Sequence, residues 1–159
     1  MPVAPSRSLA SVLAPARVRV GLHAADKDDL LRAMVALVDD APAVRDAARL
    51  LEDVRARETL MSTGVGHGLA LPHARTPAVV ETVAAFATLA EPVAYDALDG
   101  EPVRLVLLLA GPEADRRDHV RLLGRVSRLL ASADMLAALA AAPDADAVYA
   151  LFREAEGNL

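Results

Sequence analysis

The sequence predicts an α/β protein, a three-layer α/β/α sandwich around a small mixed β-sheet. Segments with helical periodicity lie before and after a central group of strand-length apolar runs, which is the pattern of such a sandwich. Hydrophobic residues make up 54% of the chain and charged residues 25%, so a disordered chain is excluded. We expect a single domain over residues 1–159, with a core from about residue 8 to residue 156.

The N-terminal part has the pattern of a short helix followed by a short strand. "SLASVLAPA" ends in Ala-x-Ala like a signal peptide, but its apolar core, residues 9–14, is shorter than the usual ~7–15 residues. We therefore interpret it as a helix. "RVRV", residues 17–20, alternates as a strand does.

Two amphipathic helices are predicted next. Asp26 and Asp29 resemble a capping pair, and apolar side chains then recur at helical spacing over residues 30–38. The second helix is predicted over residues 43–57. Its apolar stripe consists of Val44, Ala47, Leu51 and Val54.

The middle of the chain carries strand signals. "GLALP", residues 68–72, predicts a brief strand that its final proline ends, because proline has no N–H for the ladder. Residues 83–90 and 103–111 are strand-length apolar runs with an Asp99-Gly100 turn between them. The second run is nearly continuous, which favours a strand covered on both faces.

The last third of the chain is predicted to be helical, over residues 115–130, 132–142 and 144–156. Ser132 and Asp144 are suited to cap the second and third of these helices, and a proline between them separates the two.

Composition excludes several classes of function. The net charge of −5, with two Phe, two Tyr and no Trp, argues against a nucleic-acid partner, which requires basic density and stacking rings. Without cysteine the chain has no disulfide, no thiolate metal site and no cysteine nucleophile. Its apolar stretches fall short of the roughly 20 residues of a membrane helix, so we expect no membrane insertion and a cytoplasmic protein.

A glycine-rich segment is the first candidate site. Gly64, Gly66 and Gly68 leave the backbone free to aim successive N–H groups into one concavity, beside the Ser62 and Thr63 hydroxyls. Such a concavity binds anions. The alternative is an ordinary glycine turn between two elements.

His73 follows the proline that ends this strand. A neutral imidazole with one nitrogen held by a neighbour presents the other nitrogen as a fixed nucleophile. The alternative is a half-buried histidine that only satisfies a backbone carbonyl. The pattern therefore leaves both readings open.

His119 and Arg57 are the other candidates. His119 lies on the predicted buried face of its helix, in the first turn, where the helix dipole attracts an anion. A core histidine near a helix end is the alternative. Arg57 ends the helix that precedes the glycine segment and is close enough in sequence to reach an anion there. Four later arginines fit a solvated surface or a partner with an acidic face. They are Arg117, Arg121, Arg125 and Arg128.

"RETLMSTGVGHGLALPHAR", residues 57–75, resembles the signature of the fructose/mannitol-type enzyme IIA components of the bacterial phosphoenolpyruvate-dependent sugar phosphotransferase system. The resemblance extends over nearly the whole chain. It implies a mixed sheet with helices on both sides. It also implies that His73 accepts phosphate on Nε2 from the phosphocarrier HPr, or its nitrogen-branch relative, and passes it to a cysteine of a IIB domain. Arg57 and His119 match the family's two other active-site positions.

His67 departs from the commonest family pattern, which has asparagine at this position. It could donate a hydrogen bond to the phosphoryl group, bind a metal together with His73, or lie exposed. Two histidines without a clear third ligand make a poor zinc centre, so a metal-binding protein is the least favoured interpretation. Phosphoryl transfer between histidines requires no nucleotide and no metal, so we expect no cofactor.

The absence of cysteine and of membrane spans predicts a IIA separate from its IIB and IIC components. Two roles follow from the resemblance. The chain is either a carrier in sugar uptake, with a separate IIB as acceptor, or a regulatory protein of the nitrogen branch, whose target responds to phosphorylation of His73. We favour the regulatory role.

Overall fold

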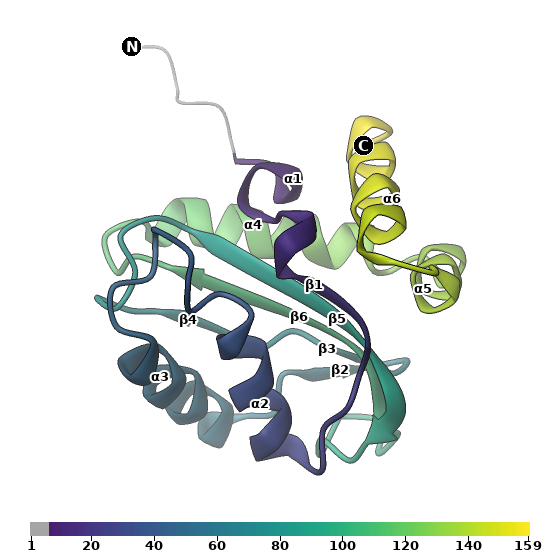
Figure 1. Cartoon of the computed structure of the whole chain (residues 1–159), viewed down its shortest axis with the longest axis horizontal. Coiled ribbons are helices and arrows are strands. Elements are labelled where there is room, and N and C mark those ends of the chain that lie inside the picture. Colours follow the sequence, from purple (N-terminus) through teal and green to yellow (C-terminus); the bar gives the residue numbers. More distant parts are fainter. Residues whose placement is uncertain (1–6) are drawn as a thin grey trace.

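The computed structural model describes residues 7–159 and confirms the predicted fold class: a mixed sheet lies between two layers of helices (Figure 1). Along the chain the elements are α1 (Leu9–Val12), η1 (Pro15–Arg17), β1 (Val18–Leu22), α2 (Lys27–Ala36), α3 (Ala47–Leu60), β2 (Gly64–Gly66), β3 (Leu69–Ala70), β4 (His73–Arg75), β5 (Val83–Val93), β6 (Val103–Gly111), α4 (Arg116–Leu129), α5 (Ala133–Ala141) and α6 (Ala145–Gly157). The predicted extent of the domain begins at residue 1, outside the described residues, and stays a prediction.

The strand order of the sheet is β1-β5-β6-β3-β2, and β4 also pairs with β6. β1 is parallel to β5, and β3 and β4 are parallel to β6, whereas the β5–β6 and β2–β3 pairs are antiparallel. β3 and β4 lie one after the other along β6, because Leu69 is level with Leu105 and His73 with Leu109. The proline between them ends β3, but the ladder with β6 resumes at His73, so the prediction that the proline ends this strand pairing is wrong and β4 was not predicted.

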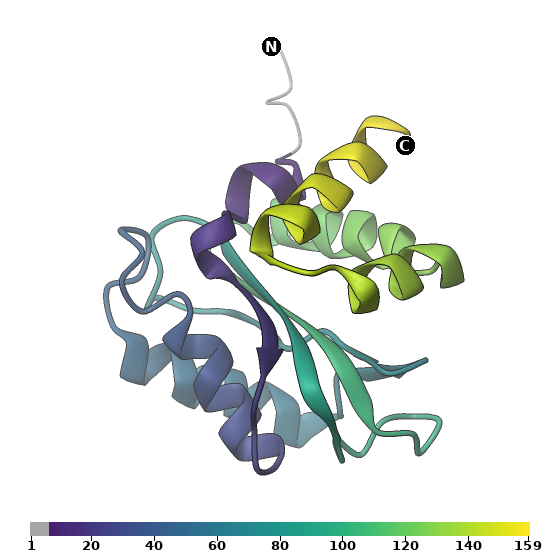
Figure 2. The ribbon, with the colours of Figure 1, turned by 45° about the vertical axis from the view of Figure 1, so that its right-hand side comes forward.

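β6 confirms the prediction of a strand covered on both faces. Leu107 and Leu109 enter the core beneath α1, α4, α5 and α6, whereas Leu108 and Ala110 enter the core beneath α2 and α3. Figure 2 shows these two groups of helices on opposite sides of the sheet. Each fully buried leucine of this kind contributes about 1.5–3 kcal/mol of hydrophobic free energy, so β6 anchors both layers.

Helix caps form where the sequence predicts them. The Asp26 carboxylate accepts a hydrogen bond from the Asp29 N–H at 2.8 Å at the start of α2. Ser132 and Asp144 cap α5 and α6 through the N–H groups of Met135 and Ala147. These side chains satisfy N–H groups that have no partner within the helix.

The predicted start of α3 is wrong. The helix begins at Ala47, after an Asp46 cap, because the preceding segment instead bridges to Val79 through Val44. The buried face of α3 consists of Leu50, Val54 and Glu58. Val54 of the predicted stripe is therefore confirmed, while Val44, Ala47 and Leu51 are only partly buried against the same core. Glu58 is a carboxylate on a buried face, and such a group requires partners.

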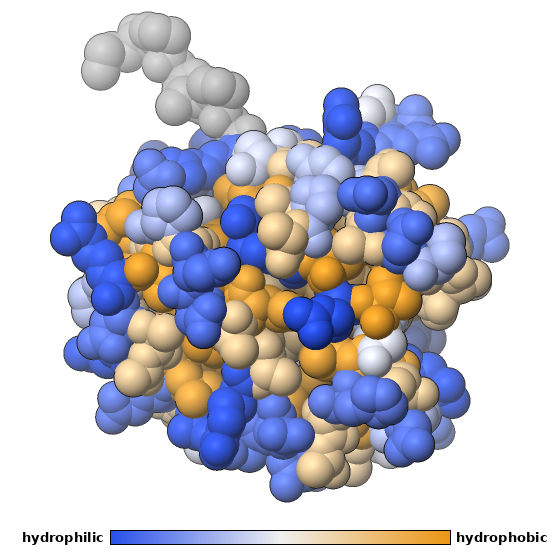
Figure 3. Space-filling view, viewed as in Figure 1, coloured by the Kyte–Doolittle hydropathy of each residue, from blue (hydrophilic) through white to orange (hydrophobic). Residues whose placement is uncertain are grey.

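The surface is mixed. Figure 3 shows hydrophobic and hydrophilic residues interspersed over one side of the molecule. Among residues 7–159, no helix combines the length and the apolar character that a membrane span requires.

Candidate functional site

A pocket of about 750 Å³ brings three of the predicted site residues together. Arg57 comes from α3, His73 from β4 and His119 from α4, so both helical layers and the sheet contribute to its walls. Arg75 and Arg116 also line it. A pocket with three guanidinium groups and two imidazoles is suited to a multiply charged anion.

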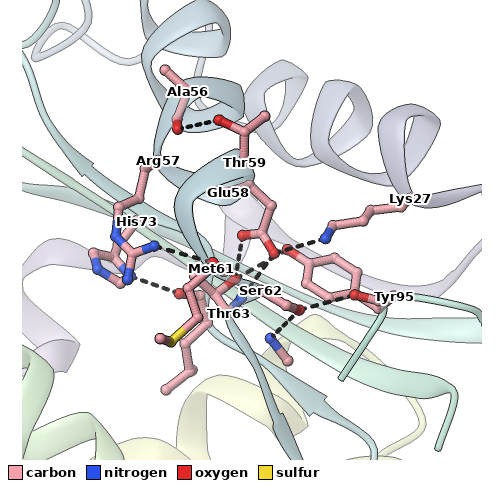
Figure 4. Close-up of polar contacts among 12 residues, drawn as sticks. Lys27, Ala56, Arg57, Glu58, Thr59, Met61, Ser62, Thr63, His73 and Tyr95 are labelled. Carbon is pink, nitrogen blue, oxygen red and sulfur yellow. Dashed lines mark hydrogen bonds and ion pairs between the residues drawn. The ribbon is translucent and has the colours of Figure 1, made fainter. Parts of the chain in front are cut away.

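His73 has one ring nitrogen fixed by the backbone. Its Nδ1 lies 2.8 Å from the carbonyl oxygen of Leu71, two residues earlier (Figure 4). A carbonyl oxygen only accepts hydrogen bonds, so Nδ1 carries the proton and Nε2 keeps its lone pair in the neutral ring. Both interpretations of His73 therefore apply to the same ring. One nitrogen satisfies a backbone carbonyl, and the other is available to react.

The environment favours the neutral form of His73. Burial of the half-exposed ring lowers its pKa below the usual value, and the positive charge of Arg57 lowers the pKa further, while the bond to Leu71 opposes both effects. A neutral imidazole at neutral pH is the nucleophilic form.

His119 faces His73 across the pocket, with the ring centroids 5.8 Å apart. The side chain is buried, as predicted, yet neither ring nitrogen has a hydrogen-bond partner within the described residues. Burial, and then the neighbouring charges of His73 and Arg75, lower the pKa of His119 to about 4. An unpartnered buried polar group costs about 1–3 kcal/mol, so this ring lacks a partner that an anion in the pocket could supply.

Arg57 is held at the end of α3. One of its guanidinium nitrogens, Nη1, donates a hydrogen bond to the Met61 carbonyl at 3.1 Å, and Figure 4 shows the guanidinium beside the His73 ring. A guanidinium has five N–H donors. Among residues 7–159 the other donors of Arg57 have no hydrogen-bond partner, so they can serve an anion bound next to His73.

The chain as a whole is similar to known proteins. The family described as "Phosphoenolpyruvate-dependent sugar phosphotransferase system, EIIA 2" matches residues 11–155. The chain belongs to this family. It is therefore a phosphotransfer protein of that system, as the resemblance of residues 57–75 predicts.

Individual relatives come from both branches of the EIIA family. The chain is 38% identical over 141 residues to the nitrogen regulatory protein of Pseudomonas aeruginosa, covering 89% of this chain and 92% of the relative. It is 36% identical over 111 residues to a fructose-specific EIIA component of Haloferax volcanii, covering 70% and 72%. The crystal structure of nitrogen regulatory protein IIA-Ntr from Neisseria meningitidis superimposes with a TM-score of 0.85 at 28% identity, covering 91% and 98%.

In this EIIA chain the first part of the glycine segment is not at the pocket. The Ser62 hydroxyl donates to the Tyr95 carbonyl at 2.9 Å, and the Gly64 N–H donates to Ser62 Oγ at 3.1 Å. The Thr63 N–H and hydroxyl donate to Glu58. Because these donors already have partners inside the protein, the geometry does not support the predicted anion nest at these residues.

The second part of the segment forms the tip of a hairpin. The prediction of a loop misses β2, which pairs with β3 so that Gly66, His67 and Gly68 make the turn, with φ of 96°, 57° and 76°. Leu69 and His73 lie level with Leu105 and Leu109 on β6, so Leu69 is ~13 Å along the sheet from His73, and the tip lies beyond Leu69. The structure therefore does not bring these three residues to His73.

Backbone conformation is compatible with asparagine at the position of His67, the residue that the resemblance implies there. Left-handed φ values are unfavourable for most side chains, but Asn, Asp and His adopt them several times more often than other residues. The His67 N–H donates to Asp99 Oδ2 at 3.0 Å, which fixes the turn. Within residues 7–159, no three His, Cys, Asp or Glu side chains are grouped as metal ligands would be.

The sequence analysis missed two residues that line the pocket and one buried residue next to Arg57. Arg75 and Arg116 line it, although their sequence positions give no distinguishing signal. Glu58 does have a signal, because it follows Val54 by four residues and so lies on the buried stripe of α3. A carboxylate at a core position next to Arg57 predicts a buried polar network.

Proposed function

We propose that this EIIA chain is a phosphoryl carrier that accepts phosphate on Nε2 of His73 from an HPr-type protein. The observation that carries the proposal is the hydrogen bond from Nδ1 of His73 to the Leu71 carbonyl, which leaves Nε2 as the nucleophile inside a cationic pocket. No cofactor takes part.

The transfer is a displacement at phosphorus. The Nε2 lone pair attacks the phosphoryl group of the donor's phosphohistidine, the donor's P–N bond breaks, and its electron pair returns to the donor imidazole. The His73 ring becomes positively charged while Nδ1 keeps its proton, and the Leu71 carbonyl stabilises that charge. Arg57 and His119 bind the phosphoryl oxygens, because positioning and charge compensation dominate phosphoryl transfer.

The rim of the pocket is suited to a protein donor. Leu60 and Val120 line the pocket yet have exposed fractions of 82% and 59%, and Met61, which follows Leu60, is 63% exposed. Apolar side chains around a charged centre are typical of protein–protein contact surfaces. We infer that the donor, and later the acceptor, docks on these three residues.

Phosphorylation by a purified system tests the proposal. With phosphoenolpyruvate, enzyme I and an HPr-type donor, we expect an acid-labile, base-stable phosphoprotein carrying phosphate on Nε2 of one histidine, identified by ³¹P and ¹⁵N NMR. His73→Ala should remove the label, whereas His23→Ala should keep it because His23 is exposed and outside the pocket. Label that persists in His73→Ala would overturn the assignment.

Within the family we favour a regulatory protein of the nitrogen branch. The similarity to the Pseudomonas relative is the observation that favours it, since it spans 92% of that relative at 38% identity. In this role phosphorylation of His73 changes which target protein the surface binds. We further propose a cytoplasmic location, where an HPr-type donor would be available.

A role in sugar uptake is the second candidate, favoured by the similarity to the fructose-specific EIIA component. In that case a cysteine of a separate IIB protein takes the phosphate from His73. Incubating the phosphorylated chain with candidate IIB proteins separates the roles. Rapid loss of label to a IIB cysteine supports uptake, whereas label that IIB proteins leave in place supports regulation.

A further inference from the structure

We propose that Glu58, acting through Thr63, is a positioning residue that holds His73 in the tautomer protonated at Nδ1. Its effect on phosphoryl transfer rests on the proposed function, but its effect on the tautomer does not. Glu58 lies in a buried hydrogen-bond network with Thr63, Lys27 and Tyr95, to one side of Arg57 and His73 (Figure 4).

Glu58 is the acceptor at the centre of this network. Oε1 accepts the Thr63 N–H at 2.8 Å, Oε2 accepts the Thr63 hydroxyl at 2.6 Å, and Lys27 Nζ lies 3.0 Å from Oε1. Glu58 is 6% exposed and Thr63 5%. A buried carboxylate with three donors fixes the groups that donate to it, because breaking any of these bonds leaves a buried polar group unpaired.

Tyr95 completes the network at Thr63. Its hydroxyl lies 3.2 Å from the Thr63 hydroxyl oxygen, and burial raises the pKa of Tyr95, so the phenol stays protonated. Since the Thr63 hydroxyl donates to Glu58, the phenol donates to Thr63. Lys27 Nζ lies 4.5 Å from the centroid of the Tyr95 ring, which adds a cation–π contact.

A short chain of hydrogen bonds leads from this network to the nucleophile. The Thr63 carbonyl accepts the Leu71 N–H at 3.0 Å, and the Leu71 carbonyl accepts Nδ1–H of His73 at 2.8 Å. Anything that fixes the Thr63 backbone therefore fixes the carbonyl that selects the His73 tautomer. The same helix end carries Arg57, bonded to the Met61 carbonyl.

Two adjacent residues of α3 thus hold the two ends of the segment from residue 61 to residue 63. Arg57 holds residue 61 and reaches His73, while Glu58 holds residue 63. Because Arg57 and Glu58 are neighbours on one helix, the position of the Arg57 guanidinium is coupled to that of the His73 ring. Displacements near 1 Å in such an arrangement reduce transfer about 100-fold.

The experiment uses Thr63→Val and Glu58→Gln in the full chain. In two-bond ¹H–¹⁵N spectra we expect wild-type His73 to be protonated at Nδ1. Both variants should populate the tautomer protonated at Nε2 and slow phosphoryl transfer ~10- to 100-fold. Thr63→Ser should return both properties to near wild type, because serine restores the hydroxyl.

Thr88→Val is the matched control. Thr88 is similarly buried, on β5, and its hydroxyl oxygen accepts only the Gly21 N–H among the hydrogen bonds of residues 7–159. This variant loses one buried hydroxyl without touching the chain that leads to His73. We expect an unchanged tautomer and an unchanged rate.

A wild-type tautomer in Thr63→Val overturns the proposal, whether or not transfer slows. If that variant does not fold, Tyr95→Phe replaces it, because it removes only the donor to Thr63 and should shift the tautomer in the same direction. An unchanged tautomer there overturns the proposal as well. If the wild-type chain accepts no phosphate, the proposed function fails, while the tautomer still decides the role of Glu58.

Discussion

His73 and His119 lie on opposite walls of one pocket, 5.8 Å apart between ring centroids, but their ring nitrogens are in opposite situations. Nδ1 of His73 is bonded to a carbonyl, which a hydrogen-bonded chain from Glu58 supports. The nitrogens of His119 are buried and have no partner within residues 7–159. The β4 side of the pocket is therefore ordered before any ligand arrives, whereas the α4 side has hydrogen-bonding capacity that is not used.

This difference suggests a division of labour in phosphoryl transfer. In the proposed function the ordered side supplies the nucleophile His73 and, from the neighbouring end of α3, the fixed positive charge of Arg57, which together determine the rate of attack. The α4 side gains its first hydrogen bond when a phosphoryl group enters, and so contributes to holding the product. If so, changes on the β4 side should affect the rate more than changes on the α4 side.

Arg57→Ala tests the ordered side and has the largest expected effect. Loss of a fixed donor beside the transferred group should slow phosphorylation of His73 ~100- to 1,000-fold, with the midpoint of urea unfolding nearly unchanged because Arg57 is partly exposed. Rapid-quench measurement with a phosphorylated HPr-type donor gives the rate. Arg55→Ala is the matched control, since Arg55 lies on the same helix but pairs with Asp28. Equal rates in the two variants would remove Arg57 from the site.

The pH dependence of stability tests the state of the α4 side. The pKa of His119 is about 4 in the folded protein against 6.5 ordinarily, so the unfolded chain binds more protons between these values. The contribution of neutral His119 to the free energy of unfolding should therefore be fully present above pH 6.5. It should be lost as the pH falls to 4, which lowers the free energy of unfolding by about 3 kcal/mol at most. His73, whose pKa is also lowered, adds to the same trend.

Urea unfolding at pH 4, 5, 6 and 7 measures this dependence. His119→Leu should remove most of the change in the free energy of unfolding between pH 4 and pH 7. His73→Ala should remove the smaller part that remains. If the slope in His119→Leu matches that of the wild type, the α4 side does not hold its histidine in the neutral, unpartnered state described above.

His119→Leu should also separate stability from transfer at pH 7. Leucine fills a similar volume and has no polar atoms, so the free energy of unfolding should rise by about 1 kcal/mol. Transfer should slow about tenfold, a smaller loss than for Arg57→Ala. A variant that is less stable than the wild type would identify His119 as an ordinary core histidine. A rate loss greater than that of Arg57→Ala would show that the α4 side, and not the ordered side, has the larger effect on the transfer rate.

The sequence predicted the fold because its signals are local. Caps such as Asp26 and the continuous apolar run of β6 depend on neighbours along the chain, and these elements are confirmed. The start of α3 was mispredicted because Val44 bridges to Val79, a contact between residues distant in sequence. Periodicity does not report such a contact.

The pocket was predictable in part for a similar reason. The resemblance pointed to Arg57, His73 and His119, which the fold brings together, but the glycine spacing also suggested an anion nest that the hydrogen bonds do not support. Glycine permits both a nest and a hairpin turn, and pairing of β2 with β3 selects the turn. Which donors remain free depends on tertiary partners such as Glu58 and Tyr95.

His67→Asn has the smallest expected effect. It tests whether His67, like His73 and His119, takes part in phosphoryl transfer. His67 adopts a φ of 57° at the hairpin tip, a conformation that asparagine tolerates at least as well. We expect a gain of a few tenths of a kcal/mol in stability and a transfer rate within about twofold of the wild type, since the tip is more than ~13 Å along the sheet from His73. His67→Val is the contrasting variant. It should lose about 1–2 kcal/mol because β-branched residues are disfavoured at positive φ. A marked loss of transfer in His67→Asn, with stability retained, would show that the hairpin tip takes part in phosphoryl transfer, and the two-sided description of the pocket would then be wrong.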